Sequence, residues 1–144
     1  RQNRSLAING NYRQNSGAFV CVNPNIPTLG AFSVSGSFSI PTNEGAFIRY
    51  TGSGASTSSA YVIYDIYGLQ AMKCNLNKYF RLDYNISGTQ TFGWNWNSSL
   101  ATHEGFDPIG GTGYPFTGSL DGRTFTVSGL NINRATRITS VCSV

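Results

Sequence analysis

The segment from Ala31 to Ile40 alternates apolar and polar side chains with a period of two. This pattern predicts a β-strand with one buried face and one solvated face. A helix would scatter the same residues around its circumference, and its backbone would compete with the serines for hydrogen bonds. One wet face is typical of antiparallel sheets. The apolar positions are Phe32, Val34, Phe38 and Ile40, and the polar ones are Ser33, Ser35, Ser37 and Ser39.

Similar runs of β-branched and aromatic residues recur along the chain, each followed by turn residues. They predict an all-β fold, an antiparallel β-sandwich or jelly roll, with a small antiparallel β-barrel as the alternative. We expect at most one short helix, near residues 69–79, where helix-forming residues are interrupted by asparagines. The other predicted strands are 5–12, 17–22, 45–51, 60–67, 81–86, 90–96, 123–130 and 134–144.

Glycines provide two further signals. The dipeptide Asp121-Gly122 between two apolar runs predicts a tight two-residue hairpin. Gly-Ala-Phe occurs three times, beginning at Gly17, Gly30 and Gly45. Because the flanking residues do not match, we interpret it as a glycine turn that leads into a strand, rather than as an internal repeat.

The composition is uniform over 144 residues, which predicts a single β domain at 1–144. Residues 1–16 form either an N-terminal arm or an exchangeable edge strand within it. Leu6 and Ile8 share one strand face, Tyr12 ends the run, and a polar linker follows at 13–16. A strand on such a linker can join its own sheet or that of a neighbour, so these three residues are the candidate assembly residues.

The net charge and the hydropathy argue against two classes of partner, nucleic acids and a membrane-spanning site. The net charge is +4, and the three arginines among the first thirteen residues would neutralise few phosphates, so nucleic-acid binding is not expected. No apolar stretch approaches the roughly 20 residues of a membrane span. Arginine at position 1 indicates a mature or trimmed chain, and we expect an extracellular or surface-exposed protein.

The three cysteines, Cys21, Cys74 and Cys142, have neither CxxC spacing nor a neighbouring histidine. A structural zinc site needs four such ligands, so we predict no metal and no cofactor. At most one intramolecular disulfide can form, and its three pairings remain open.

Catalytic residues are scarce. The single histidine, His103, lies in a glycine-rich stretch, and no Gly-x-Ser-x-Gly motif occurs. Six carboxylates leave a glycoside hydrolase as a residual alternative, since that reaction needs two of them across a cleft. We therefore expect a non-enzymatic protein.

The strongest candidate for a binding site is the alternation of Phe92, Trp94 and Trp96 within the predicted strand 90–96. Three rings on one side of a strand can stack against sugar rings, or they can form the centre of the core. The polar residues expected to bond sugar hydroxyls are Asn95, Asn97 and Tyr114.

Two functions follow from these features. The first is a non-enzymatic extracellular structural or adhesive subunit of a fibre, pilus or virion surface, which self-associates through β-strand edges. The alternative is a lectin-like carbohydrate-binding module that uses the aromatic platform and takes a glycan ligand.

Overall fold

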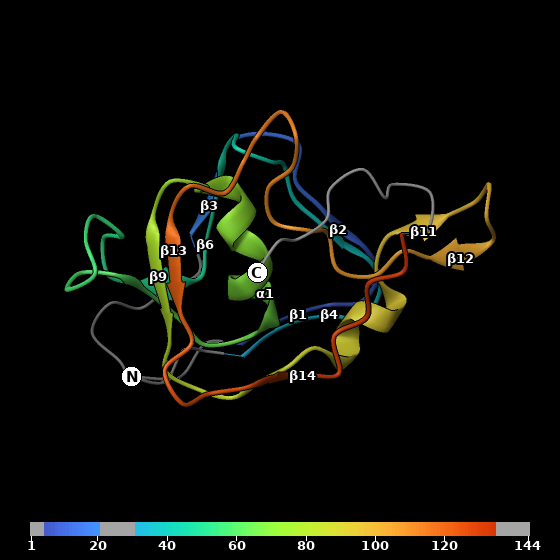
Figure 1. The fold of residues 1–144 in the computed structure, drawn as a ribbon. Coiled ribbons are helices and arrows are strands. Elements are labelled where there is room, and N and C mark those ends of the chain that lie inside the picture. The colour runs from blue at the N-terminus through green and yellow to red at the C-terminus, as the bar shows by residue number, and fades with distance from the viewer. Residues whose placement is uncertain (1–4, 21–30, 135–144) are drawn as a thin grey trace.

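The computed structural model describes residues 5–20 and 31–134 of the chain. Short β-strands predominate in this part, together with one short α-helix and two 3-10 turns (Figure 1). The prediction of an all-β fold is confirmed. Among the described residues, no helix is long and apolar enough to cross a bilayer.

Two segments of the N-terminal half lie side by side and run in the same direction. Each holds three short strands, and each strand of one pairs in parallel with the matching strand of the other. We call residues 6–20 the first rung and residues 32–48 the second rung. The first contains β1 (Leu6–Ile8), β2 (Tyr12–Arg13) and β3 (Ala18–Val20), and the second contains β4 (Phe32–Val34), β5 (Phe38–Ser39) and β6 (Ala46–Ile48).

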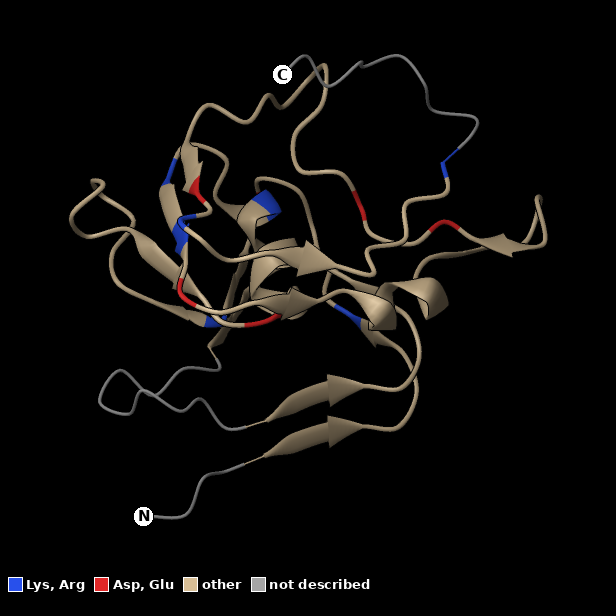
Figure 2. Ribbon diagram, turned by 60° about the horizontal axis from the view of Figure 1, so that its bottom comes forward, with Lys and Arg blue, Asp and Glu red and all other residues tan. Residues whose placement is uncertain are grey.

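The same arrangement recurs in the C-terminal half. The third rung, residues 79–88, and the fourth rung, residues 119–129, also pair in parallel. In Figure 2, β1 is the lowest strand, β4 lies next to it, and the pair formed by β10 and β14 lies above, with all four arrows pointing the same way. The third rung contains β9 (Tyr79–Leu82) and β10 (Ile86–Ser87), and the fourth contains β13 (Ser119–Asp121) and β14 (Val127–Ser128).

Four further strands complete the described part of the fold. β8 lies parallel to β9 and β7 lies antiparallel to β8, which gives a four-stranded sheet in the order β13-β9-β8-β7. β11 and β12 form an antiparallel hairpin that projects from one side of the molecule (Figure 1). The bounds are β7 (Tyr50–Thr51), β8 (Tyr61–Ile63), β11 (Trp96–Asn97) and β12 (Thr102–His103).

Six of the eight strand pairings among the described residues are parallel, so the predicted antiparallel direction is wrong for most of them. The alternation from Phe32 to Ile40 itself is confirmed, because its four apolar side chains are buried. Alternation reports that one face of a strand is buried, and a rung in a parallel stack also has one buried and one solvated face. The pattern therefore does not determine the direction of the neighbouring strand.

A glycine-centred repeat underlies the stacking. Two of the Gly-Ala-Phe segments lead from a glycine with positive φ into a strand, as expected. These two strands also pair residue for residue, with Ala18 opposite Ala46 and Phe19 opposite Phe47, so the segments correspond between the first and second rungs. A second signal, Ile or Val followed by a polar residue and glycine, recurs once in every rung. The predictions from the sequence did not use it. Its copies are Ile8-Asn9-Gly10, Val34-Ser35-Gly36, Ile86-Ser87-Gly88 and Val127-Ser128-Gly129.

The glycines permit neighbouring rungs to approach closely. A Cβ atom at Gly36 would lie 2.9 Å from the carbonyl oxygen of Gly10, and one at Gly45 would lie 2.6 Å from that of Gly17. Real Cβ atoms do not make contacts this short, so any other residue would push the second rung away from the first.

The predicted short helix is present but begins earlier, as α1 (Ile66–Ala71), and continues as the 3-10 turn η1 (Met72–Cys74). The strand predicted at 60–67 therefore ends at Ile63. Asp65 stops it, because Oδ1 of Asp65 caps the helix by accepting a hydrogen bond of 2.9 Å from the backbone N–H of Gly68. Oδ2 of Asp65 pairs with Nε of the buried Arg49 at 2.5 Å.

The hairpin predicted at Asp121-Gly122 does not form. The segment turns there, with Oδ1 of Asp121 accepting from the backbone N–H of Arg123, which has a φ of 50°. The strand before the turn pairs in parallel with β9 instead of folding back on the following segment. An Asp-Gly pair thus predicts the turn but not which strands it joins.

Candidate functional site

The outer edge of the first rung is an open sheet edge in the described part of the chain. β1, β2 and β3 each pair on one side, with the second rung. The backbone of Leu6 and Ile8 faces β4, since Leu6 N–H donates to Ala31 and Ile8 C=O accepts from Ser35. Successive peptide groups of a strand point to opposite sides, so the N–H and C=O of Ala7 point outward.

The side chains at this edge continue the stacking of the core. Tyr12 stacks on Phe38 with ring centroids 5.4 Å apart, and Phe19 stacks on Phe47 at 5.2 Å. Phe38 and Phe47 are buried, whereas Tyr12 and Phe19 are half-buried and Leu6 is 42% exposed. The first rung therefore carries the same kind of apolar side chains as the second rung, but these side chains are less buried.

The glycines of the first rung are also less closely packed than those of the second. Gly36 and Gly45 have their Cβ positions filled by the backbone of the first rung. The corresponding glycines of the first rung, Gly10 and Gly17, have positive φ values and nothing within 4 Å of a Cβ atom. The space that the first rung fills for the second is thus not filled, by any described residue, on the outer side of the first rung.

Two of the three strands at this edge, β1 and β3, also lack the usual protection against strand addition. Exposed edges are commonly blunted by charged residues, proline or a bulge. β1 and β3 carry no charged residue and no proline, and Figure 2 shows β1 and β4 without charge. Arg13 in β2 is the single charged residue between positions 5 and 20.

The predicted row of three aromatic rings is not formed. Residues 90–96 do not make one strand, because Thr89–Gly93 form the 3-10 turn η2 and Asn95 adopts a φ of 55°. Asparagine tolerates this left-handed conformation, which rotates the chain between the two tryptophans. Trp94 is fully buried in the core, whereas Trp96 is 57% exposed.

A polar groove with a volume of about 410 Å³ lies beside Trp96. Of the six residues predicted to bind a ligand, Trp96, Asn95 and Asn97 line it, whereas Phe92, Trp94 and Tyr114 do not. The indole of Trp96 rests edge-to-face on His103 across the hairpin, with centroids 4.9 Å apart. The other lining residues are Ser98, Glu104, Asp107 and Arg134.

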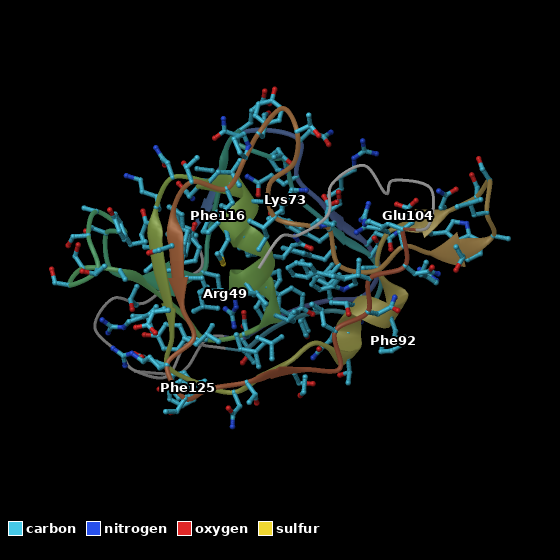
Figure 3. All side chains as sticks on the ribbon, in the orientation of Figure 1. Arg49, Lys73, Phe92, Glu104, Phe116 and Phe125 are labelled. Atoms are coloured by element: carbon cyan, nitrogen blue, oxygen red, sulfur yellow. The ribbon has the colours of Figure 1, made fainter. Side chains whose placement is uncertain are left out.

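Ion pairs fix the charged wall of this groove. Arg134 binds Glu104 at 3.0 Å and Asp107 at 3.2 Å, and Asp107 also pairs with the buried Lys73. The second oxygen of Glu104 accepts from Nδ2 of Asn97 at 2.7 Å. Figure 3 shows Glu104 near the base of the β11–β12 hairpin and Phe92 on the outer side of η2. These charged residues were not predicted, because no motif links their positions in the sequence.

Cys74 is a buried free thiol, so the two disulfide pairings that involve it are not formed. Its Sγ donates to the carbonyl oxygen of Pro41 at 3.4 Å, and burial raises the pKa of the thiol. Cys21 and Cys142 lie outside the described residues. Within the described ranges, no group of three or more His, Cys, Asp or Glu side chains is placed to hold a metal ion.

Comparisons with known proteins give one partial similarity. No family model matches the chain, and no solved structure matches it. The chain is 36% identical over 89 residues to Halomucin from Haloquadratum walsbyi (strain DSM 16790 / HBSQ001). This match covers 60% of the chain and 1% of Halomucin, so the chain spans about one hundredth of that protein. The chain is therefore similar to a small part of Halomucin.

Proposed function

We propose that this protein is a non-enzymatic structural or adhesive subunit of an extracellular or cell-surface assembly, such as a fibre, a pilus or a virion surface. It self-associates by adding a β-strand at the outer edge of the first rung. The observation that carries this proposal is the edge of β1 and β3, which is uncharged and, among the described residues, open. The similarity to part of Halomucin supports a surface location.

Strand addition at this edge would repeat contacts that the chain already makes internally. The outward N–H and C=O of Ala7 would pair with an incoming strand, and that strand would cover the half-exposed side chains of Leu6 and Tyr12. Buried apolar surface contributes about 25 cal/mol per Å², so covering several such side chains adds to the main-chain hydrogen bonds.

The replacement Ala7→Pro tests this edge. Proline removes the outward N–H of residue 7 and places its ring on the outer edge, while the inward N–H groups of Leu6 and Ile8 remain. We expect the weight-average mass of the unmodified protein to rise by about twofold or more across a concentration series. The mass of the Ala7→Pro variant should stay at that of one chain. Light scattering on native and reduced samples measures both.

The matched control is Ala7→Val, which keeps the N–H and favours an extended strand. This variant should assemble like the unmodified protein. An unmodified protein that remains monomeric at every concentration, or an Ala7→Pro variant that assembles normally, would contradict the proposal.

The groove beside Trp96 supports a second candidate function, binding of a neutral carbohydrate. An exposed indole can stack on the apolar face of a pyranose, and the Glu104 carboxylate and the Arg134 guanidinium can bond its hydroxyls. The motivating observation is that Trp96, Asn95 and Asn97, all predicted from the sequence, line the same groove.

The replacement Trp96→Ala should weaken binding of a pyranoside by about tenfold or more, because it removes the stacking surface. Titration calorimetry with the methyl glycosides of glucose, galactose, mannose and N-acetylglucosamine measures the loss. Phe92→Ala is the control, since Phe92 is 61% exposed but lies outside the groove, and it should bind as the unmodified protein does. Equal binding by the Trp96→Ala variant would place the ligand elsewhere, and no binding of any glycoside by the unmodified protein would refute this candidate.

A further inference from the structure

The fourth rung has an open outer edge of its own within the described residues. β14 pairs on one side, with β10, and β13 ends its sheet beside β9. The carbonyl groups of Thr126 and Ser128 accept from the third rung, so the N–H and C=O of Val127 point outward. Leu120 in β13 points its backbone outward for the same reason, because Ser119 N–H donates to the carbonyl oxygen of Lys78, the residue just before the third rung.

The two open edges are alike in sequence and in burial. In each pair of rungs the Ile or Val of the repeated motif lies opposite its counterpart, Ile8 opposite Val34 and Ile86 opposite Val127. The inner members, Val34 and Ile86, are buried, whereas Val127 is exposed and Ile8 is half-buried. The first and fourth rungs thus each carry the repeated motif next to an open edge, and within the chain the same motif pairs with its copy in the neighbouring rung.

We propose that the outer edge of the fourth rung of one copy pairs in parallel with the outer edge of the first rung of a second copy. This inference rests on the proposed self-assembly and names its geometry. The parallel pairing that joins the rungs inside the chain would continue across the boundary between copies.

The internal pairs also indicate the register. Val127 would lie opposite Ile8, which places Gly129 opposite Gly10, as Gly36 lies beside Gly10 within the chain. No described residue lies within 4 Å of the Cβ position of Gly10, so an incoming backbone can come as close to the first rung as the first rung comes to the second.

Joining two different surfaces is head-to-tail association, which does not close unless the rotation per copy returns to the start. Such a contact leaves one edge free at each end of every oligomer. The expected product of the unmodified protein is therefore a growing series of oligomers rather than a single symmetric dimer.

Two variants blocked at opposite edges test this geometry. Ala7→Pro blocks the first rung, and Val127→Pro removes the outward N–H of the fourth rung while leaving the carbonyl groups of Thr126 and Ser128 in place. Each variant alone should be monomeric by light scattering and analytical ultracentrifugation. An equimolar mixture should form dimers, with a twofold rise in mass and no larger species, because one open edge of each kind remains.

A second pair of variants guards against misfolding. Arg13→Pro and Leu120→Pro remove other outward N–H groups of the same two rungs and should behave in the same way. Circular dichroism and thermal unfolding identify the variants that keep the native fold.

The outcomes separate this inference from the proposed function. If the unmodified protein assembles but Val127→Pro alone dimerises, the first-rung edges pair with each other and the head-to-tail geometry is wrong. If the unmodified protein assembles and the mixture stays monomeric, the fourth rung is not the partner. If the unmodified protein is monomeric throughout, the proposed function itself fails.

Discussion

Replacing Phe47 with alanine is expected to lower the free energy of unfolding by about 3–5 kcal/mol. The side chain is fully buried, and its ring lies at the centre of the aromatic cluster of the first two rungs. Its centroid is 5.0 Å from that of Phe38, 5.2 Å from that of Phe19 and 5.5 Å from that of Phe32. Removing it leaves a cavity that the facing rings, which include Tyr12 at 5.6 Å, cannot fill without losing their own contacts. Urea unfolding monitored by circular dichroism under reducing conditions measures the loss.

The control for Phe47→Ala is the same substitution at an exposed site. Phe92→Ala should change the free energy of unfolding by less than about 0.5 kcal/mol, because its ring lies on the outer side of η2. A loss below about 1 kcal/mol for Phe47→Ala would show that the two rungs do not pack around this ring.

Replacing Asp65 with alanine is expected to cost about 3–5 kcal/mol, since it removes the carboxylate that pairs with the buried guanidinium of Arg49. Arg49 is 4% exposed and lies in the interior next to α1 (Figure 3). The same substitution removes the cap of α1. Asp65→Asn keeps an oxygen for the cap and should cost less by about 1 kcal/mol. Chemical unfolding of the two variants separates the cap from the ion pair.

Asp83 provides the matched control. It pairs with Arg81 and Arg123 at the surface, where an ion pair contributes at most about 1 kcal/mol. Equal losses for Asp65→Ala and Asp83→Ala would mean that burial of Arg49 does not strengthen its pair.

Side-chain alternation allowed the buried face of the second rung to be predicted, since a strand period of two determines which residues share a face. It could not distinguish parallel from antiparallel neighbours, because direction depends on where the chain returns. The recurrence of Ile or Val, a polar residue and glycine was the available signal, and four copies in one chain indicate stacked parallel rungs.

The aromatic site could be predicted only in part. The alternation of Phe92, Trp94 and Trp96 implied one continuous strand, and the left-handed backbone of Asn95 breaks it. Trp96 remained at the surface, and Trp94 entered the core. The charged wall of the groove could not be predicted, because Glu104, Asp107 and Arg134 meet through the tertiary fold rather than through a local motif.

Parallel pairing also determines the order in which contacts become available during synthesis. A parallel strand cannot be joined to its neighbour by a tight turn, so the first rung must wait for the second to be made. Residues 6–20 find their partner only when residues 32–48 have left the ribosome, and residues 79–88 wait longer still for 119–129. Long-range pairing of this kind slows folding and prolongs the exposure of unpaired edges. Nascent chains on one messenger would therefore present open first rungs to one another before any of them had folded.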